Sequence, residues 1–285
     1  MNKKIKIFSA LISILAFTAI ILIGCTKNND SKKPLIVATS GTLYPASYHD
    51  SKTNKLVGYD IEIARAVAKG LDRKIEFKEY NVDGQLTAVK TGKADFAAND
   101  FNISPTRQKK FTTSTVYKYS FNSVMVRASD NSGINSWADI KGKKAAGEAG
   151  TGYQRLAQQL GATLVNYDNV SNDVYLRDVK NSKTDFIMND YYLQSLALKA
   201  MPNSGLTLPS NLYFNTEEDK SGVGFLMQKG DTKLQKQVNE QLKKLKKDGT
   251  IKKLSEKYYG ADVTKKPTVK NIHTFKIESK YDGRQ

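Results

Sequence analysis

A short apolar segment in the first half of the chain ends on polar and charged residues. Residues 96–98 are predicted to form a strand, which is followed by Asn99 and Asp100 and then, after a loop, by Arg107. Ligands of open α/β sheets bind in the crevice outside the carboxyl ends of the strands. This stretch is therefore a candidate binding edge, and the other elements must be arranged around it.

The same pattern of residues occurs a second time, 90 positions later. Residues 83–100 and 173–190 align without a gap and are identical at nine of eighteen positions, including the final Asn-Asp pair. Each copy has the pattern of a capped helix, a turn and a buried strand, so the repeat predicts two lobes of like α/β topology. If the lobes face each other, Asp100 and Asp190 lie on opposite walls of a cleft. Alternatively, both aspartates only cap loops by binding nearby backbone.

Hydrophobic periodicity predicts the elements that position this edge. Strands are expected over residues 35–38 and 75–77, and helices over residues 60–71 and 234–260, the last broken at Asp248-Gly249. The alternation of strands and helices is typical of the α/β fold class.

A glycine-rich segment, residues 147–153, opens another predicted helix. Backbone N–H groups at a helix N-terminus can bind an anion, although a plain tight turn is the alternative. The segment is not a nucleotide-binding loop, because the Lys-Ser/Thr pair that such a loop needs does not follow.

The composition excludes several classes of function. The chain has 285 residues and a formal net charge of +17. Its lysines are scattered and do not alternate with aromatic residues, so we expect no nucleic-acid partner but a solvated basic surface compatible with an anionic cell envelope. One cysteine excludes an intrachain disulfide, and two distant histidines argue against a zinc site or a His-based triad. No metal or cofactor is expected.

The N-terminus has the pattern of a secretory signal. Lys3, Lys4 and Lys6 precede an apolar run over residues 7–23, and residues 1–24 are predicted to be a signal peptide. The sequence Leu-Ile-Gly-Cys that ends at Cys25 resembles a bacterial lipobox, which implies an acylated Cys25 and a lipid-anchored tether over residues 25–33. The alternative is a single membrane-spanning anchor, for which the run is short. Both interpretations place the remainder outside the cytoplasm.

The motifs, in their order and spacing, resemble those of the extracytoplasmic solute-binding proteins of polar amino-acid ABC importers, family 3. The resemblance covers about residues 34–262 and is carried by five segments: LVGYDIEIARAVAK (56–69), ISPTR (103–107), IKGKKAAGEAGTGY (140–153), NDYYL from Asn189, and KKDGTIKKLSEKYYG (246–260).

This resemblance implies a two-lobed periplasmic-binding-protein-like type II fold, in which each lobe is a sheet flanked by helices. Two hinge crossings are expected, near residues 124–127 and 222–225. The expected division is lobe 1 over 34–125 and 224–262, lobe 2 over 126–223, and a loosely attached C-terminal tail over 263–285.

The resemblance also implies roles for the site residues. Arg107 would form a bidentate pair with the α-carboxylate of an amino acid, which suits a planar guanidinium. The other expected contacts are the backbone amides of Thr151 and Gly152 to the same carboxylate, Asp190 to the α-ammonium, and the rings of Tyr44 and Tyr59 around the side chain.

Departures from the family pattern bear on the ligand. Residues 111–114 are Phe-Thr-Thr-Ser where Asp-Phe-Ser is usual, and Asp100 stands where a small residue is usual. With Asn99 and Asn102, these features look like the cystine-type branch. An additional carboxylate disfavours an acidic ligand and could accept a second ammonium, so cystine is expected ahead of lysine, arginine and ornithine.

We expect a monomeric binding protein, not an enzyme, whose partners are a small-molecule amino acid, a membrane-embedded ABC permease, and the membrane through Cys25. Two alternatives remain: a dehydratase-like enzyme on the same fold, with Glu148 as the spare carboxylate, and a surface adhesin or sensory binding module.

Overall fold

The computed structural model describes residues 33–167, 170–217 and 222–281. The chain divides into two units, residues 1–33 and residues 34–285, and the fold below is that of the second unit. The predicted signal peptide, Cys25 and all but the last residue of the tether lie outside the described residues. Within the described residues, every helix is too short or too polar to cross a bilayer.

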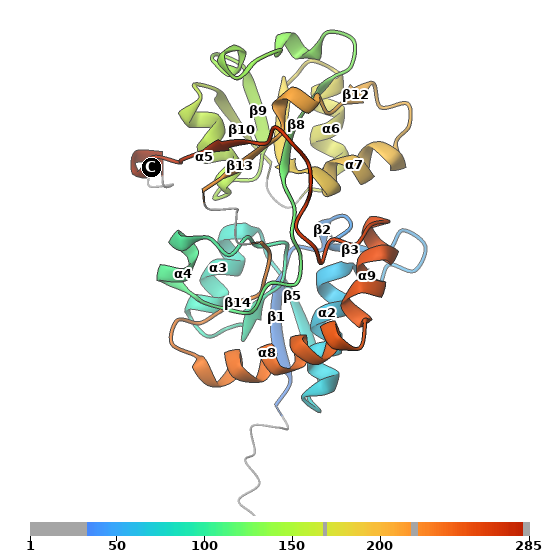
Figure 1. The fold of residues 1–285 in the computed structure, drawn as a ribbon, viewed down its shortest axis with the longest axis vertical. Coiled ribbons are helices and arrows are strands. Elements are labelled where there is room, and N and C mark those ends of the chain that lie inside the picture. The colour runs from blue at the N-terminus through green and yellow to red at the C-terminus, as the bar shows by residue number, and fades with distance from the viewer. Residues whose placement is uncertain (1–32, 168–169, 218–221, 282–285) are drawn as a thin grey trace, which may run out of the picture. The chain divides into compact units, whose positions relative to one another are not determined.

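The first sheet has five strands in the order β5-β1-β6-β14-β7 (Figure 1). β1, β5 and β6 are parallel, whereas β14 comes from a late part of the chain and runs antiparallel to β6 and β7. A small antiparallel sheet, β2-β3-β4, lies between β1 and α2 in the sequence. The bounds are β1 Leu35–Thr39, β2 Thr42–Leu43, β3 Ser47–His49, β4 Leu56–Val57, β5 Ile75–Glu79, β6 Phe96–Ala97, β7 Thr112–Thr113 and β14 Leu226–Met227.

Helices pack around this sheet through their apolar faces. The predicted stripe of the helix after β4 is confirmed, because Ile61, Ala64 and Val67 are fully buried. The late amphipathic segment forms two helices that break at Asp248-Gly249, as predicted, and its inner face joins the same core as Leu35 and Phe96. The bounds are α2 Tyr59–Gly70, α3 Val82–Lys90, α4 Pro105–Lys110, α8 Thr232–Lys247 and α9 Thr250–Tyr259.

The second sheet has the strand order β10-β9-β11-β8-β13-β15, and β12 pairs with β8. Its strands are β8 Asn122–Arg127, β9 Lys144–Gly147, β10 Thr163–Asn166, β11 Phe186–Asp190, β12 Leu206–Thr207, β13 Phe214–Thr216 and β15 His273–Phe275. Its helices are α5 Gly152–Gln159, α6 Asn172–Lys180 and α7 Tyr191–Ala200, and the short 3₁₀ turns are η2 Asn131–Gly133, η3 Trp137–Ile140, η4 Ser210–Leu212 and η5 Ser279–Tyr281.

The two sheets repeat one arrangement. In the first, α3 leads into β6, which is parallel to β1 and antiparallel to β14; in the second, α6 leads into β11, which is parallel to β9 and antiparallel to β8. The helix–strand unit that the internal repeat predicted therefore takes the same place in both sheets. The predicted α/β fold with two lobes of like topology is confirmed.

The predicted positions of the two crossings are wrong. Residues 124–127 lie within β8, which pairs with β11 from Asn122 to Val126, and Val124, Met125 and Val126 are core residues. The chain instead crosses before β8, and residues 222–225 are already bonded to the first half of the fold: the carbonyl of Gly222 accepts a hydrogen bond from the N–H of Ile103. β13, which ends at Thr216, still belongs to the second sheet.

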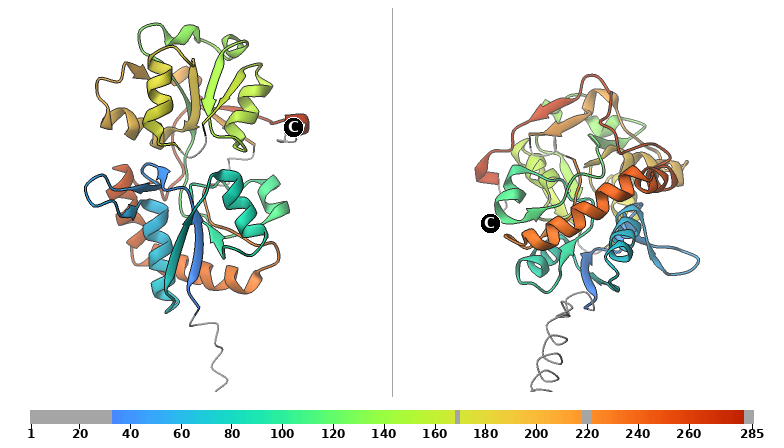
Figure 2. Two further views of the ribbon diagram at one scale, coloured as in Figure 1. Left: turned by 180° about the vertical axis from the view of Figure 1, so that it is seen from behind. Right: turned by 60° about the horizontal axis from the view of Figure 1, so that its bottom comes forward.

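The C-terminal segment is not a loosely attached tail, contrary to expectation. β15 pairs in parallel with β13 at the edge of the second sheet, and the ring centroid of Phe275 lies 4.8 Å from that of Trp137. After α9 the chain thus runs from the first half of the fold to the second sheet, which is a third connection between the halves, as the red segment in Figures 1 and 2 shows. A strand of three residues is too short to produce a visible sequence period.

Candidate functional site

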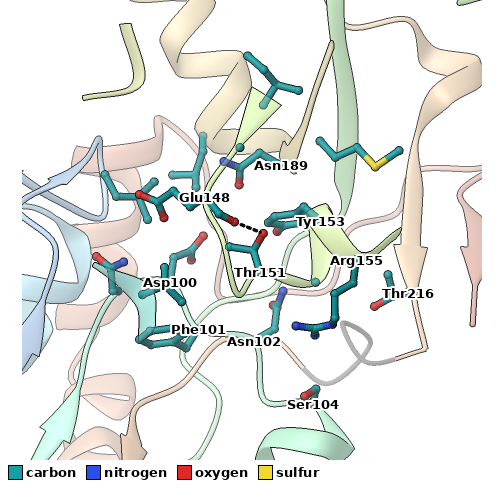
Figure 3. A pocket seen from close by; sticks show the side chains of 18 of the residues that line it. Asp100, Phe101, Asn102, Ser104, Glu148, Thr151, Tyr153, Arg155, Asn189 and Thr216 are labelled. Carbon is teal, nitrogen blue, oxygen red and sulfur yellow. Dashed lines mark hydrogen bonds between the residues drawn. The ribbon is translucent and has the colours of Figure 1, made fainter. Parts of the chain in front are cut away.

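A pocket is lined by residues of both halves of the fold (Figure 3). The first half contributes the segment that follows β6 and the start of α4, and the second half contributes the loop after β9, the first turn of α5 and the end of β11. Ligand sites favour such positions at strand ends and between lobes. The predicted site residues that line the pocket are Asn99, Asp100, Asn102, Arg107, Thr151 and Gly152.

The carboxyl ends of β1 and β6 are held together by buried hydroxyl and amide groups. Thr39 Oγ1 donates to the carbonyl of Ala98 at 2.7 Å and contacts Ser47 Oγ at 2.6 Å. Ser40 Oγ donates to Asn99 Oδ1 at 2.9 Å. Asn99 is thereby fixed as a part of the pocket wall.

Asp100 adopts an unusual backbone conformation beside Asn99. Its φ is +55°, in the left-handed region that Asp tolerates better than most residues. The N–H of Asp100 donates to Asp60 Oδ2 at 2.5 Å, and Asp60 is itself fully buried in the first turn of α2. The Asp60 carboxylate therefore helps to hold the turn that presents Asp100 to the pocket.

Arg107 is positioned by the start of α4. Ser104 caps this helix, and its Oγ accepts the N–H of Arg107 at 3.0 Å. The guanidinium donates through Nη1 to the carbonyl of Asn102 at 3.0 Å and lies 4.9 Å from the ring centroid of Phe101. These contacts orient a planar group suited to bidentate binding of a carboxylate.

The opposite wall is formed by the first turn of α5. Thr151 caps the helix: its Oγ1 accepts the N–H of Gln154 at 3.3 Å and donates to the carbonyl of Glu148 at 2.9 Å, as the dashed line in Figure 3 shows. Gly152 begins the helix, and the Tyr153 hydroxyl donates to Asn122 Oδ1 at 3.1 Å. The amides of this turn have the geometry that favours an anion.

Arg155 also lines the pocket, and sequence reasoning missed it. Its Nη1 donates to the carbonyl of Gly150 at 3.2 Å. A cation in the first turn of a helix is opposed by the helix dipole, and this mismatch was the signal that could have identified Arg155 as a functional residue.

Asp190 is buried and is not among the residues that line the pocket. Its Oδ1 caps α7 by accepting the N–H of Leu193 at 3.1 Å. Its Oδ2 accepts a hydrogen bond from Lys118 Nζ at 2.5 Å, and the same Nζ donates a hydrogen bond to Asp100 Oδ1 at 2.8 Å. Lys118, which is fully buried, therefore joins the two aspartates that the repeat made equivalent. No sequence pattern had indicated this lysine.

Burial perturbs the protonation of this cluster. Burial raises the pKa of Asp100 to about 6 although Lys118 opposes the shift, and burial together with the charge of Asp100 raises the pKa of Asp60 to about 7. Burial alone would lower the pKa of Lys118, but Asp100 and Asp190 outweigh it, so the net pKa is raised. Lys118 is therefore charged at neutral pH.

The two tyrosines expected around the ligand side chain do not line the pocket. Tyr59 is fully buried in the core, where its hydroxyl donates to the carbonyl of Tyr117 at 2.9 Å and its ring packs on Tyr259. The prediction that Tyr59 faces the ligand is therefore wrong. Tyr44 is half-buried and contacts the ring of Tyr48 edge-on at 4.8 Å, and the neighbouring Leu43 lines the pocket instead.

Comparison with known proteins identifies the family. The family model of bacterial extracellular solute-binding proteins, family 3, matches residues 35–261. The chain belongs to this family. As a member, it is an extracytoplasmic solute-binding protein, as the motifs had predicted. In the described part of the chain, no group of three or more His, Cys, Asp or Glu residues is arranged to hold a metal ion.

Several relatives are bacterial transport proteins. The chain is 44% identical over 281 residues to the probable ABC transporter extracellular-binding protein YckB of Bacillus subtilis, covering 93% of this chain and 95% of that protein. It is 32% identical over 275 residues to the L-cystine-binding protein TcyA of the same organism, with coverages of 91% and 99%.

Solved structures agree with this assignment. A crystal structure of B. subtilis YckB matches with a TM-score of 0.66 and 46% identity, covering 86% of this chain and 97% of that one. An ancestral arginine-binding protein bound to arginine matches with a TM-score of 0.72 and 28% identity, covering 80% and 98%.

Proposed function

We propose that this protein captures a zwitterionic amino acid in the pocket between its two sheets and delivers it to a membrane-embedded ABC permease. The observation that carries the proposal is the pairing of opposite charges in one pocket: Arg107 and Asp100 both line it. A zwitterion satisfies both groups, whereas a simple anion or cation satisfies one. The names of the relatives YckB and TcyA support an importer and an amino-acid ligand.

In the proposed pose, Arg107 and the amides of Thr151 and Gly152 bind the α-carboxylate. Asp100, which lines the pocket, binds the α-ammonium, and Asp190 is linked to Asp100 through Lys118. Asn99 and Asn102 offer neutral polar contacts to the rest of the ligand. Because the groups come from both sheets, a bound ligand stabilises the arrangement in which the walls are close together.

For the ligand we propose L-cystine or a related polar amino acid, ahead of lysine, arginine and ornithine. The 32% identity to a cystine-binding relative supports cystine, and a match to an arginine-bound structure keeps the cationic amino acids in the test. We propose further that residues 1–24 are a signal peptide, that Cys25 is acylated, and that the protein acts as a monomer without catalysing a reaction.

A thermal-shift screen of the twenty amino acids and L-cystine tests the ligand, because binding to the native state raises apparent stability. At 100 times Kd the expected gain is about 2.7 kcal/mol. A screen in which none of the compounds raises the Tm would refute the amino-acid proposal. Conversion of any bound compound into a product, followed by mass spectrometry, would instead show an enzyme.

The Arg107→Ala variant tests the site. We expect its affinity for the compound found in the screen to fall at least 100-fold, about 2.7 kcal/mol, because two charge-assisted hydrogen bonds are lost. Arg177→Ala is the matched control, since this side chain is 61% exposed and pairs only with Asp173 among the ion pairs described. Equal affinities of the two variants by calorimetry would contradict the assigned role of Arg107.

A further inference from the structure

Lys118 lies between the two aspartates that the sequence assigned to ligand cations. The repeat predicted Asp100 and Asp190 on opposite walls of a cleft, and the family resemblance assigned the α-ammonium of the ligand to Asp190. The structure instead has the ammonium of Lys118 there, 2.8 Å from Asp100 Oδ1 and 2.5 Å from Asp190 Oδ2. The protein thus supplies one cation to this pair from its own chain.

The position of this ammonium is fixed by contacts that do not involve a ligand. The backbone of Lys118 accepts the N–H of Val223, so the first crossing is bonded to the end of the return crossing. Its Nζ also lies 5.2 Å from the ring centroid of Tyr259 in α9. Both the main chain and the head group are therefore held, and the side chain is fully buried.

The charge of the cluster then determines how many ligand cations the pocket can accept. Two aspartates against one lysine leave a single negative charge, which one ligand ammonium neutralises. Without Lys118 the two buried carboxylates could both stay ionised only if a ligand supplied the cation, so a ligand with a second positive group would be favoured. Asp60, which accepts the N–H of Asp100, is a third buried carboxyl, and the charge of Lys118 also lowers its pKa, so loss of Lys118 favours its neutral form and adds no further negative charge.

We propose that Lys118 is a specificity-determining residue: by occupying the cation position between Asp100 and Asp190, it limits these aspartates to one ligand ammonium and disfavours a cationic side chain beside them. The expectation that Asp100 accepts a second ammonium of cystine is thereby replaced, and that group of a bound cystine would lie away from the two aspartates. The proposal rests on the function proposed above. Lys118 does not line the pocket, so it acts on the choice between neutral and cationic ligand side chains as a positioning residue, through its contact with Asp100.

The test compares two ligands of nearly the same shape and different charge, L-arginine and L-citrulline. Their Kd values are measured by calorimetry, directly or by competition, for wild type and for Lys118→Met. We expect the ratio of affinities to shift toward arginine by about tenfold or more in the variant. Lys69→Met, at an exposed position of α2, removes the same net charge and should leave the ratio unchanged.

The Lys118→Met variant leaves two buried carboxylates unpaired and could fail to fold, so the same substitution is also made in the Asp100→Asn variant. In Asp100→Asn the ratio should shift toward citrulline, and adding Lys118→Met to this variant should reverse the shift by about tenfold. Lys118→Arg, which keeps the cation, should retain the wild-type ratio.

The outcomes separate this proposal from the function itself. If wild type binds no amino acid in the screen, the proposed function fails. If wild type binds an amino acid but Lys118→Met leaves the arginine-to-citrulline ratio unchanged in both backgrounds, Lys118 is only a structural link and the specificity role is overturned. Failure of both folded Lys118→Met variants to bind arginine at all would overturn it as well.

Discussion

The buried carboxyl of Asp60 should make the protein more stable in mildly acidic solution than at alkaline pH. Its pKa is raised from the ordinary value of 3.8 to about 7, first by burial and then by the charge of Asp100. Between these two values the folded protein binds more protons than the unfolded chain, so the free energy of unfolding increases as the pH falls through about 7. This contribution is fully present below about pH 4 and is lost as the pH rises above 7.

The size of the effect follows from the two pKa values. Between pH 8 and pH 5, a carboxyl that titrates near 7 when folded and near 4 when unfolded adds about 2.5 kcal/mol of stability. Asp100, with a pKa of about 6, contributes in the same direction, so the pair is treated together in the wild type. The Asp60→Asn variant removes the pH-dependent contribution of Asp60 to the free energy of unfolding and retains an oxygen that can accept the N–H of Asp100.

Urea denaturation of wild type and Asp60→Asn at pH 5, 6, 7 and 8 measures this effect. We expect the two curves of unfolding free energy against pH to converge toward pH 5 and to separate by about 2.5 kcal/mol toward pH 8, with the variant the more stable there. The exposed carboxylates and His49 titrate alike in both proteins and cancel in the difference. Parallel curves across this range would refute the reasoning.

Three further changes test other parts of the fold. Asp190→Asn leaves Lys118 short of a buried partner and should destabilise by about 3–5 kcal/mol in urea, whereas Asp173→Asn, in an exposed pair, should cost under about 1 kcal/mol; equal losses would contradict the buried link. A Cβ at Gly150 would meet the carboxylate of Asp83, an exposed side chain that must rotate away, so Gly150→Ala should weaken amino-acid binding only modestly. Gly142→Ala has a similar φ and open space and is its control, and equal calorimetric affinities would argue against this contact. Truncation after residue 270 removes β15 and should lower the Tm by roughly 4–8 °C through lost apolar burial, and an unchanged Tm would mean that the pairing with β13 contributes nothing.

The sequence was sufficient for features that local patterns encode. The repeat identified the equivalent strands β6 and β11, and the periodicity after residue 60 located the buried face of α2. Tyr59 shows that a motif does not by itself say which face of a helix a residue occupies. It lies four residues before Ile63 and eight before Val67, so it shares their buried face. The family motif suggested a ligand contact, but helix geometry assigns the ring to the core.

Lys118 could not be found from the sequence because its partners are 18 and 72 residues away. A lysine in a chain with 45 basic residues reads as a solvated surface residue, and nothing local distinguishes a buried one. The crossings were misplaced for a related reason: an apolar triplet is compatible both with a connection between lobes and with a central strand, and only the pairing of β8 with β11 decides.

The place of Trp137 gives the protein an optical reporter of its own. It is the only tryptophan in the sequence, its indole packs edge-on against Phe275 of β15 and Phe214 of β13, and it does not line the pocket. Emission excited selectively from the indole therefore reports on whether the C-terminal strand is seated against the second sheet. The aromatic side chains that line the pocket are tyrosine and phenylalanine, so the indole signal contains no contribution from a tryptophan at the ligand site.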